Sequence, residues 1–381
     1  MLEDVGTSAN NIIQLDSNGK IPAVDGSLLT GVDTSLSAAS DPTISTNPSG
    51  GVGTKYKNTT SGEIYICTDA TAGSNVWTNV GPGSGNIVPI AYIGNRGIFS
   101  GGYESGNRNE MDYIAIPTLG NATDFGDLTS GVQAGGGCSN SNRGLIGGGQ
   151  VRIAIDYITI ATPGNAADFG DLVNGTSQWY GPASSSNGTR GVFGGGVDAS
   201  IKQPYIDYVT IVTLGNSIDF GNLTITRSQS SSCASLTRSL FLGGRGATDR
   251  VNTIDYITTA TIGNAVDFGD LTVARNGAAC SNLTRGVLSG GRIAAGGGTT
   301  NVIDYVTMAT TGNATDFGDL TRTDTDEISA CANRTRATMA GGYGTPYSNI
   351  IDYFTIDTPG NAVDFGDLTV ARSSASGLSG D

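Results

Sequence analysis

The stretch Met111–Leu128, MDYIAIPTLGNATDFGDL, decides the fold of this chain. Closely similar phrases begin again at Ile155, Ile206, Ile254, Ile303 and Ile351. The first aspartate of each copy falls at Asp112, Asp156, Asp207, Asp255, Asp304 and Asp352, so the copies are 44–51 residues apart. A period in this range is typical of solenoids, propellers and arrays. We therefore interpret the chain as a scaffold of near-copies, with recognition residues where the copies differ.

Each copy predicts four short antiparallel strands. In the fifth copy, small residues at 276–283 precede the phrase around Arg285, and the stretches 302–309 and 315–320 follow. These runs alternate between apolar and polar residues and are separated by glycine and asparagine turns. No segment shows helical periodicity over three turns. The pattern predicts an all-β protein.

The spacings within the copies predict two unlike faces. A glycine pair always follows the repeated arginine by five and six residues, and the two aspartates of each phrase are always 12 apart. The other two connections vary in length, and Trp179-Tyr180 lies in an insertion. In an antiparallel sheet alternate turns share a face, so the variable connections should gather together. Insertions in repeat proteins gather on the binding side, so we expect recognition there.

Residues 95–372 resemble the kelch repeat in the glycine pair, the Asp-Tyr strand and the aromatic-x-x-Leu strand. Phenylalanine stands in place of the family's tryptophan, at Phe125, Phe169, Phe220, Phe268, Phe317 and Phe365. The resemblance implies a six-bladed β-propeller with four-stranded antiparallel blades over 86–381. The alternative is a linear β array, which would leave sheet edges open at both ends.

The end of the chain predicts how the first blade is completed. Residues 373–379 resemble the small-residue strand that opens each copy, but no further copy follows them. We expect this segment to pair beside Arg96–Gly102. The competing segment is Asn86–Ile93, whose residues Pro89, Ile90 and Tyr92 are bulkier than those of the other opening strands.

Repeated charges predict structural pairs rather than a site. One arginine recurs in each copy, at Arg96, Arg143, Arg190, Arg238, Arg285 and Arg336. We expect these arginines to pair with the six repeated aspartates inside or between blades, because a guanidinium matches a carboxylate geometrically. The alternative is a ring that binds acidic groups or sugars. The DFGD phrases predict capped turns, with a Ca²⁺ site as the alternative.

Composition excludes several functional classes. The net charge of −14 gives no electrostatic footprint for nucleic acid, and no run of 18 apolar residues predicts a membrane span. The polar start predicts no signal peptide. With no histidine, the chain lacks Ser-His-Asp chemistry and imidazole metal sites. The positions Cys138, Cys233, Cys280 and Cys331 take Ser185 in the third copy and Ala91 in the first, which predicts a small buried residue there.

The first ninety residues differ from the repeats. LDSNGKIPAVDGSLLTG at 15–31 and the stretch 41–80 resemble modules near the start of bacteriophage tail-fibre and other tail structural proteins. The resemblance implies an attachment segment at 1–40 and a small β module with a linker at 41–85. It also implies location in a virion, contacts with other virion proteins and a homo-oligomer, a trimer in fibres.

We expect a phage virion protein of the tail-fibre type that adheres to a host surface molecule such as a glycan. The alternative is a decoration or adaptor protein whose propeller binds other virion proteins. We expect no enzyme and no cofactor: a galactose-oxidase-like site needs histidines, and a glycosidase needs two isolated carboxylates. The expected contact residues are Tyr103, Arg108, Trp179, Tyr180, Lys202, Tyr205, Arg250, Arg292, Tyr343 and Tyr347.

Overall fold

The computed structural model describes residues 35–80, 94–294, 297–323 and 325–380. Within these ranges the chain consists of β-strands, turns and loops, which confirms the expected all-β class. None of the described segments forms a helix that is long and apolar enough to cross a bilayer. The chain divides into two compact units, Met1–Pro89 and Ile90–Asp381. Most of the expected attachment segment, and the expected boundary at 85/86, lie outside the described residues.

The first unit contains one small sheet. Its strands are β1 (Leu36–Ala38), β2 (Lys55–Asn58), β3 (Ile64–Asp69) and β4 (Val76–Asn79), in that spatial order. β1 runs parallel to β2, and the other neighbours are antiparallel. Alternate side chains of these strands point inward, and Tyr56, Tyr65, Cys67 and Trp77 form the core. The sheet therefore begins at Leu36, before the expected start of the β module at 41.

The second unit contains six four-stranded antiparallel sheets among its described residues, numbered here 1 to 6. Sheet 1 has β30 (Ser376–Gly380), β5 (Arg96–Ser100), β6 (Glu110–Ala115) and β7 (Thr123–Asp127); sheet 2 has β8 (Gly136–Ser139), β9 (Arg143–Gly147), β10 (Ala154–Thr159) and β11 (Ala167–Asp171). Sheet 3 has β12 (Ala183–Ser186), β13 (Arg190–Gly194), β16 (Tyr205–Thr210) and β17 (Ile218–Asn222); sheet 4 has β18 (Ser231–Ala234), β19 (Arg238–Leu242), β20 (Thr253–Thr258) and β21 (Val266–Asp270). Sheet 5 has β22 (Ala278–Ser281), β23 (Arg285–Ser289), β24 (Val302–Thr307) and β25 (Thr315–Asp319); sheet 6 has β26 (Ser329–Ala332), β27 (Arg336–Ala340), β28 (Ile350–Thr355) and β29 (Val363–Asp367). A short hairpin of β14 (Val197–Asp198) and β15 (Ile201–Lys202) extends the loop between β13 and β16.

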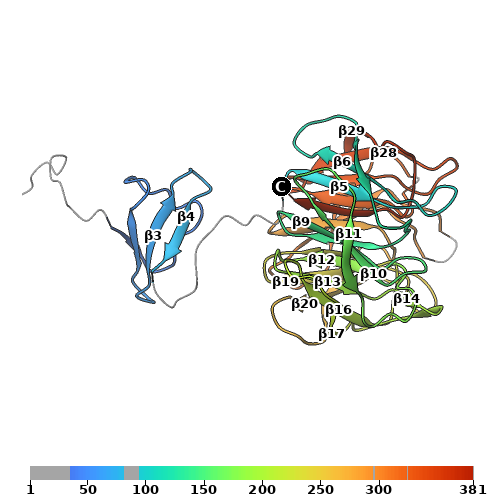
Figure 1. Ribbon diagram of the computed structural model, residues 1–381, viewed down its shortest axis with the longest axis horizontal. Coiled ribbons are helices and arrows are strands. Elements are labelled where there is room, and N and C mark those ends of the chain that lie inside the picture. Colours follow the sequence, from blue (N-terminus) through green and yellow to red (C-terminus); the bar gives the residue numbers. More distant parts are fainter. Residues whose placement is uncertain (1–34, 81–93, 295–296, 324, 381) are drawn as a thin grey trace, which may run out of the picture. The chain divides into compact units, whose positions relative to one another are not determined.

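The opening strands of these sheets lie beside one another. β8 contacts β30 and β12, β18 contacts β12 and β22, and β26 contacts β22 and β30. Figure 1 shows the sheets of this unit side by side. The four-stranded antiparallel sheets therefore have a propeller-like arrangement.

The last strand of the chain belongs to the first sheet. In β30, Ser376 lies opposite Ser100 and Gly380 lies opposite Arg96, so the expected pairing of the C-terminal strand is confirmed. The competing segment, 86–93, lies outside the described residues. Leu378 lies opposite Ile98, so it holds the place in sheet 1 that the buried cysteines hold elsewhere.

The hydrophobic core lies between neighbouring sheets. One cluster joins Ile98 and Phe125 of sheet 1 to Ile146 and Ile158 of sheet 2, with Leu378 between them. The phenylalanine of every DFG phrase is buried, and burial of one such ring contributes about 1.5–3 kcal/mol. The sequence repeat thus specifies one interface that recurs from sheet to sheet. The cysteines in the described residues are buried and unpaired, as expected for a small buried position.

The glycine of the DFG phrase allows the closest approach between sheets. Gly126 has φ +133°, and a Cβ there would lie 2.6 Å from the backbone oxygen of Gly164 in the next repeat. The next residue, Asp127, donates its backbone N–H to the side-chain oxygen of Asn165 at 3.0 Å. The same Asn contact recurs in all six repeats. The predicted capped turn at the DFGD phrase is wrong, because the phrase forms a strand in each repeat, and the asparagine of the neighbouring repeat binds the backbone of that strand.

The predicted pairing of the repeated arginines with the repeated aspartates is wrong. In sheet 1, Arg96 lies opposite Ala115, while Asp112 lies opposite Phe99. The arginine and the aspartate are therefore three residues, or about 10 Å, apart along the strands. Each arginine instead covers the tyrosine ring of its own repeat, with guanidinium-to-centroid distances of 4.3–4.9 Å. Each also donates to a backbone carbonyl of the next sheet. The stacked arginines are Arg96, Arg143, Arg190, Arg238, Arg285 and Arg336.

The repeated aspartates are buried and bind the preceding repeat. Asp255 accepts the Thr224 hydroxyl at 2.6 Å and pairs with Arg227 at 2.9 Å; both charged side chains are fully buried. Arg275, Arg322 and Arg372 pair in the same way with Asp304, Asp352 and Asp112, while Asp156 pairs with Arg152. The repeated aspartates therefore pair with a second set of arginines, outside the repeated positions.

Asp207 is the exception in this series. It accepts the Ser217 hydroxyl at 2.6 Å, the amide of Asn174 and the N–H of Val173, and within the described residues no arginine pairs with it. Burial raises the pKa of Asp207. Burial likewise lowers the pKa of Arg227, despite the opposing effect of Asp255.

Candidate functional site

The loops of variable length lie together on one side of the second unit. The loop after the second strand of a sheet pairs with the segment that enters an opening strand, as in the bridges Gly149–Trp179, Tyr180–Val197 and Ser228–Arg245. These contacts confirm the expectation that the two variable connections share a face. We call the surface that they form the loop face.

Trp179 is misplaced among the expected contact residues. Its side chain is 1% exposed, and its indole N–H donates to the carbonyl of Gly195 in the loop of sheet 3. The insertion that carries it brings this ring under the loops, where it packs with Leu172 and Phe193. Trp179 is therefore a core residue of the loop face.

Three expected tyrosines form one cluster. The ring of Tyr347 meets Tyr103 at 6.3 Å and Tyr343 at 5.5 Å, both edge to face. Tyr343 is 49% exposed, and the cluster joins loops of sheets 1 and 6. Exposed aromatic rings in a polar setting can pack on the apolar faces of sugars.

Two further expected residues, Arg108 and Tyr205, line neither of the two concavities described below. Arg108 binds Glu110 at 2.9 Å and lies 3.6 Å from Glu104, so its charge is offset locally. Tyr205 is 38% exposed at the start of β16.

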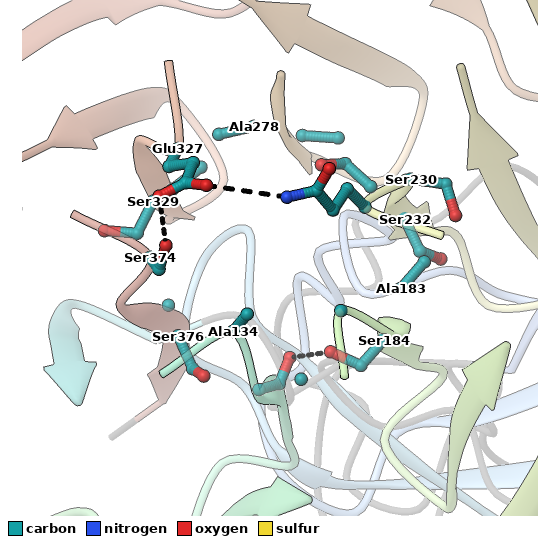
Figure 2. Close-up of a pocket in the computed structure, with 18 of the residues that line it drawn as sticks. Ala134, Ala183, Ser184, Ser230, Ser232, Ala278, Glu327, Ser329, Ser374 and Ser376 are labelled. Atoms are coloured by element: carbon teal, nitrogen blue, oxygen red, sulfur yellow. Dashed lines mark hydrogen bonds between the residues drawn. The ribbon is translucent and has the colours of Figure 1, made fainter. Parts of the chain in front are cut away.

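A polar cavity of about 130 Å³ lies among the segments that enter the opening strands. Its lining consists mainly of glycine, alanine and serine, as Figure 2 shows. Glu327 is the lining carboxylate, and it accepts the hydroxyls of Ser373 and Ser374 at 3.0 and 2.5 Å. The hydroxyls of Ser230 and Ser376 are buried without a partner in the described residues.

A larger concavity of about 480 Å³ lies next to this cavity and shares Gln229 and Glu327 with it. We call it the basic pocket. Four cations from the loops of sheets 3, 4 and 5 line it: Lys202, Arg245, Arg250 and Arg292. Tyr180 and the carboxylates of Asp326 and Glu327 complete its charged and aromatic lining.

Four of the expected contact residues thus meet in the basic pocket: Tyr180, Lys202, Arg250 and Arg292. Sequence reasoning missed Arg245, which directly follows the glycine pair of the fourth copy. The sequence did contain a signal for Arg245, because this cation lies in a variable loop and outside the repeated arginine positions. It also missed Gln229 and Glu327, which lie in segments that look like ordinary small-residue strands.

Burial and like charges determine the protonation of the pocket groups. The pKa of Lys202 is lowered, first by partial burial and then by Arg245 and Arg250. Burial raises the pKa of Tyr180 to about 12, so its phenol remains a proton donor at neutral pH. Arg292 lies 3.4 Å from Asp326, which also accepts from Asn276.

The described residues show no thiol with a lowered pKa and no metal cluster. Burial raises the pKa of the Cys138, Cys233 and Cys331 thiols to about 12, so these thiols are protonated and unreactive. Within the described ranges, no group of three or more cysteines and carboxylates is placed to hold a metal ion. The two concavities instead present polar and charged side chains that can bind a ligand.

No protein-family model matches the chain, and a search of curated proteins also finds no match. The functional argument therefore depends on the geometry of the loop face.

Proposed function

We propose that the chain is a bacteriophage virion structural protein of the tail-fibre or receptor-binding type. In this proposal the second unit is a six-bladed kelch-like propeller, and its loop face adheres to a glycan on the host surface. The first unit docks the protein to other virion proteins, in a homo-oligomer. The phage component of the proposal depends on the resemblance of residues 15–31 and 41–80 to tail modules.

The contact between β26 and β30 supports the closed propeller. It joins sheet 6 to sheet 1, and β30 itself pairs with β5, so the two ends of the repeat series share one sheet. A linear array would instead leave its first and last sheets apart, with open edges.

The observation that carries the adhesion proposal is the contrast between the repeats and their loops. The arginine–tyrosine stacks and asparagine contacts recur in every repeat and hold the sheets together. The tyrosine cluster and the basic pocket occur only in particular loops, on one face. Side chains that the scaffold does not need are available for recognition.

The test is binding of the fluorescently labelled full-length chain to a panel of bacterial strains. We expect saturable binding to at least one strain, reduced by Tyr343→Ala and Tyr347→Ala. The control is Ile262→Ala, a residue that is 55% exposed in a short turn between the last two strands of sheet 4. Binding that persists in the tyrosine variants, and also in variants that replace the cations of the basic pocket, would refute the loop face as the receptor site.

The decoration or adaptor function is the second candidate, because a folded scaffold of this kind can equally bind virion proteins. It predicts that the folded chain binds no strain of the panel but co-purifies with virion proteins through the loop face.

A further inference from the structure

The basic pocket is unusual because the chain as a whole is acidic. The net charge is −14 and the sequence has 20 lysines and arginines, yet four of the 11 residues lining this pocket are cations. Two carboxylates line it as well. Cations that converge in a concavity repel one another, and an anion bound among them offsets this repulsion.

The internal carboxylates do not neutralise the pocket. Arg292 has a partner in Asp326, and Glu327 is held by the hydroxyls of two serines. In the part of the chain that the structure describes, no ion pair joins Lys202, Arg245 or Arg250 to a carboxylate. Three cations therefore remain for a ligand.

Their hydrogen bonds point to the same conclusion. The Lys202 ammonium makes one long contact, to the carbonyl of Ala247 at 3.3 Å. The repeated arginines of the scaffold, in contrast, each have a ring and a carbonyl.

The remaining lining matches a sugar that carries the anion. The Tyr180 side chain is half-buried in the wall, and its phenol remains a donor because burial raises its pKa. Ser228 and Gln229 add neutral polar groups. The volume of about 480 Å³ lies within the usual range for small-molecule sites, roughly 300–1,000 Å³.

We propose that the basic pocket binds the carboxylate of an acidic sugar residue, with Arg245, Arg250 and Lys202 as the groups that recognise the charge. The inference deepens the proposed adhesion function and rests on it. It assigns the receptor to the acidic polysaccharides of bacterial surfaces, and it assigns Tyr180 to the neutral part of the sugar.

The experiment is calorimetric titration of the full-length protein with a uronic-acid oligosaccharide, a neutral oligosaccharide of equal length, and inorganic phosphate. We expect binding of the acidic oligosaccharide that weakens with added salt. Arg245→Gln should weaken it about tenfold to a hundredfold, the loss expected for one charge-assisted hydrogen bond. Arg245 is exposed, so this variant should fold; unchanged thermal unfolding checks it.

Lys202→Gln should weaken binding in the same way, whereas Lys57→Gln, the same change at an exposed site in β2, should not. Equal binding of the acidic and neutral oligosaccharides, or binding of phosphate alone, would overturn the inference. Strain binding that persists in Arg245→Gln and Lys202→Gln would overturn it too, while leaving adhesion intact. A chain that binds acidic oligosaccharide but no strain would instead contradict the adhesion function.

Discussion

The exception at Asp207 allows the buried ion pairs to be tested within one protein. Asp255 and Asp207 occupy the same position in neighbouring repeats, and both side chains are fully buried. Asp255 faces the fully buried Arg227, whereas Asp207 is held by Ser217 and Asn174. Replacement by asparagine keeps the size of the side chain and removes its charge in both cases.

The two substitutions should have very different costs. Asp255→Asn leaves the Arg227 guanidinium buried without a counter-charge, which typically costs about 3–5 kcal/mol. Asp207→Asn weakens hydrogen bonds to a charged acceptor but also removes an unpaired buried charge, so its net cost should be about 0–2 kcal/mol. At about 2–4 °C per kcal/mol, the melting temperature should fall by roughly 6–20 °C for Asp255→Asn and by less than about 8 °C for Asp207→Asn.

Calorimetry measures both melting temperatures, and Trp179 fluorescence in a Trp77→Phe background reports on the second unit alone. The double variant Asp255→Asn with Arg227→Met removes the unpaired charge and should recover much of the lost stability. Equal losses at the two aspartates, or a double variant no more stable than Asp255→Asn, would refute the reasoning that an unpaired guanidinium sets the cost.

Three further predictions concern the scaffold. Gly126→Ala should destabilise the second unit by about 2–5 kcal/mol, because the new Cβ meets the Gly164 backbone at positive φ, whereas Gly164→Ala has open space and should change little. Urea denaturation compares the two variants, and equal effects would contradict the close approach. Removal of residues 376–381 should lower the melting temperature strongly, because β5 loses one of its two neighbouring strands and Leu378 leaves the core; an unchanged curve would contradict the role of this strand. Because burial raises the pKa of Asp207 above 3.8, the folded state binds the extra proton and the stability contribution of this group falls as pH rises through that window. The stability of Asp207→Asn relative to the parent should therefore rise as the pH increases above about 4, and a calorimetric difference that stays flat or reverses would disprove it.

The sequence repeat was sufficient to predict the strands, because turn residues and alternation are local signals. The pairing of β30 with β5 was also predictable, since a small-residue strand without a following copy needs a partner. The prediction that Arg96 pairs with Asp112 was wrong, because two residues that recur with the same period need not lie close together in space. Their antiparallel register separates them, and Arg372 at the other end of the chain reaches Asp112 instead. A contact between residues of different repeats cannot be predicted from the residue spacing within one copy.

The loop face was predictable in kind, since its connections vary in length, but its individual residues were not. Trp179 and Tyr180 are adjacent in one insertion, yet one ring is buried under a loop and the other lines the basic pocket. Arg245 and Arg292 come from different repeats and meet only because neighbouring sheets present their loops side by side. A recognition site built from single residues of several repeats has no motif, so charge is its best sequence signal. In a chain with 34 acidic residues and 20 basic ones, the cations outside the repeated positions are the residues to examine first.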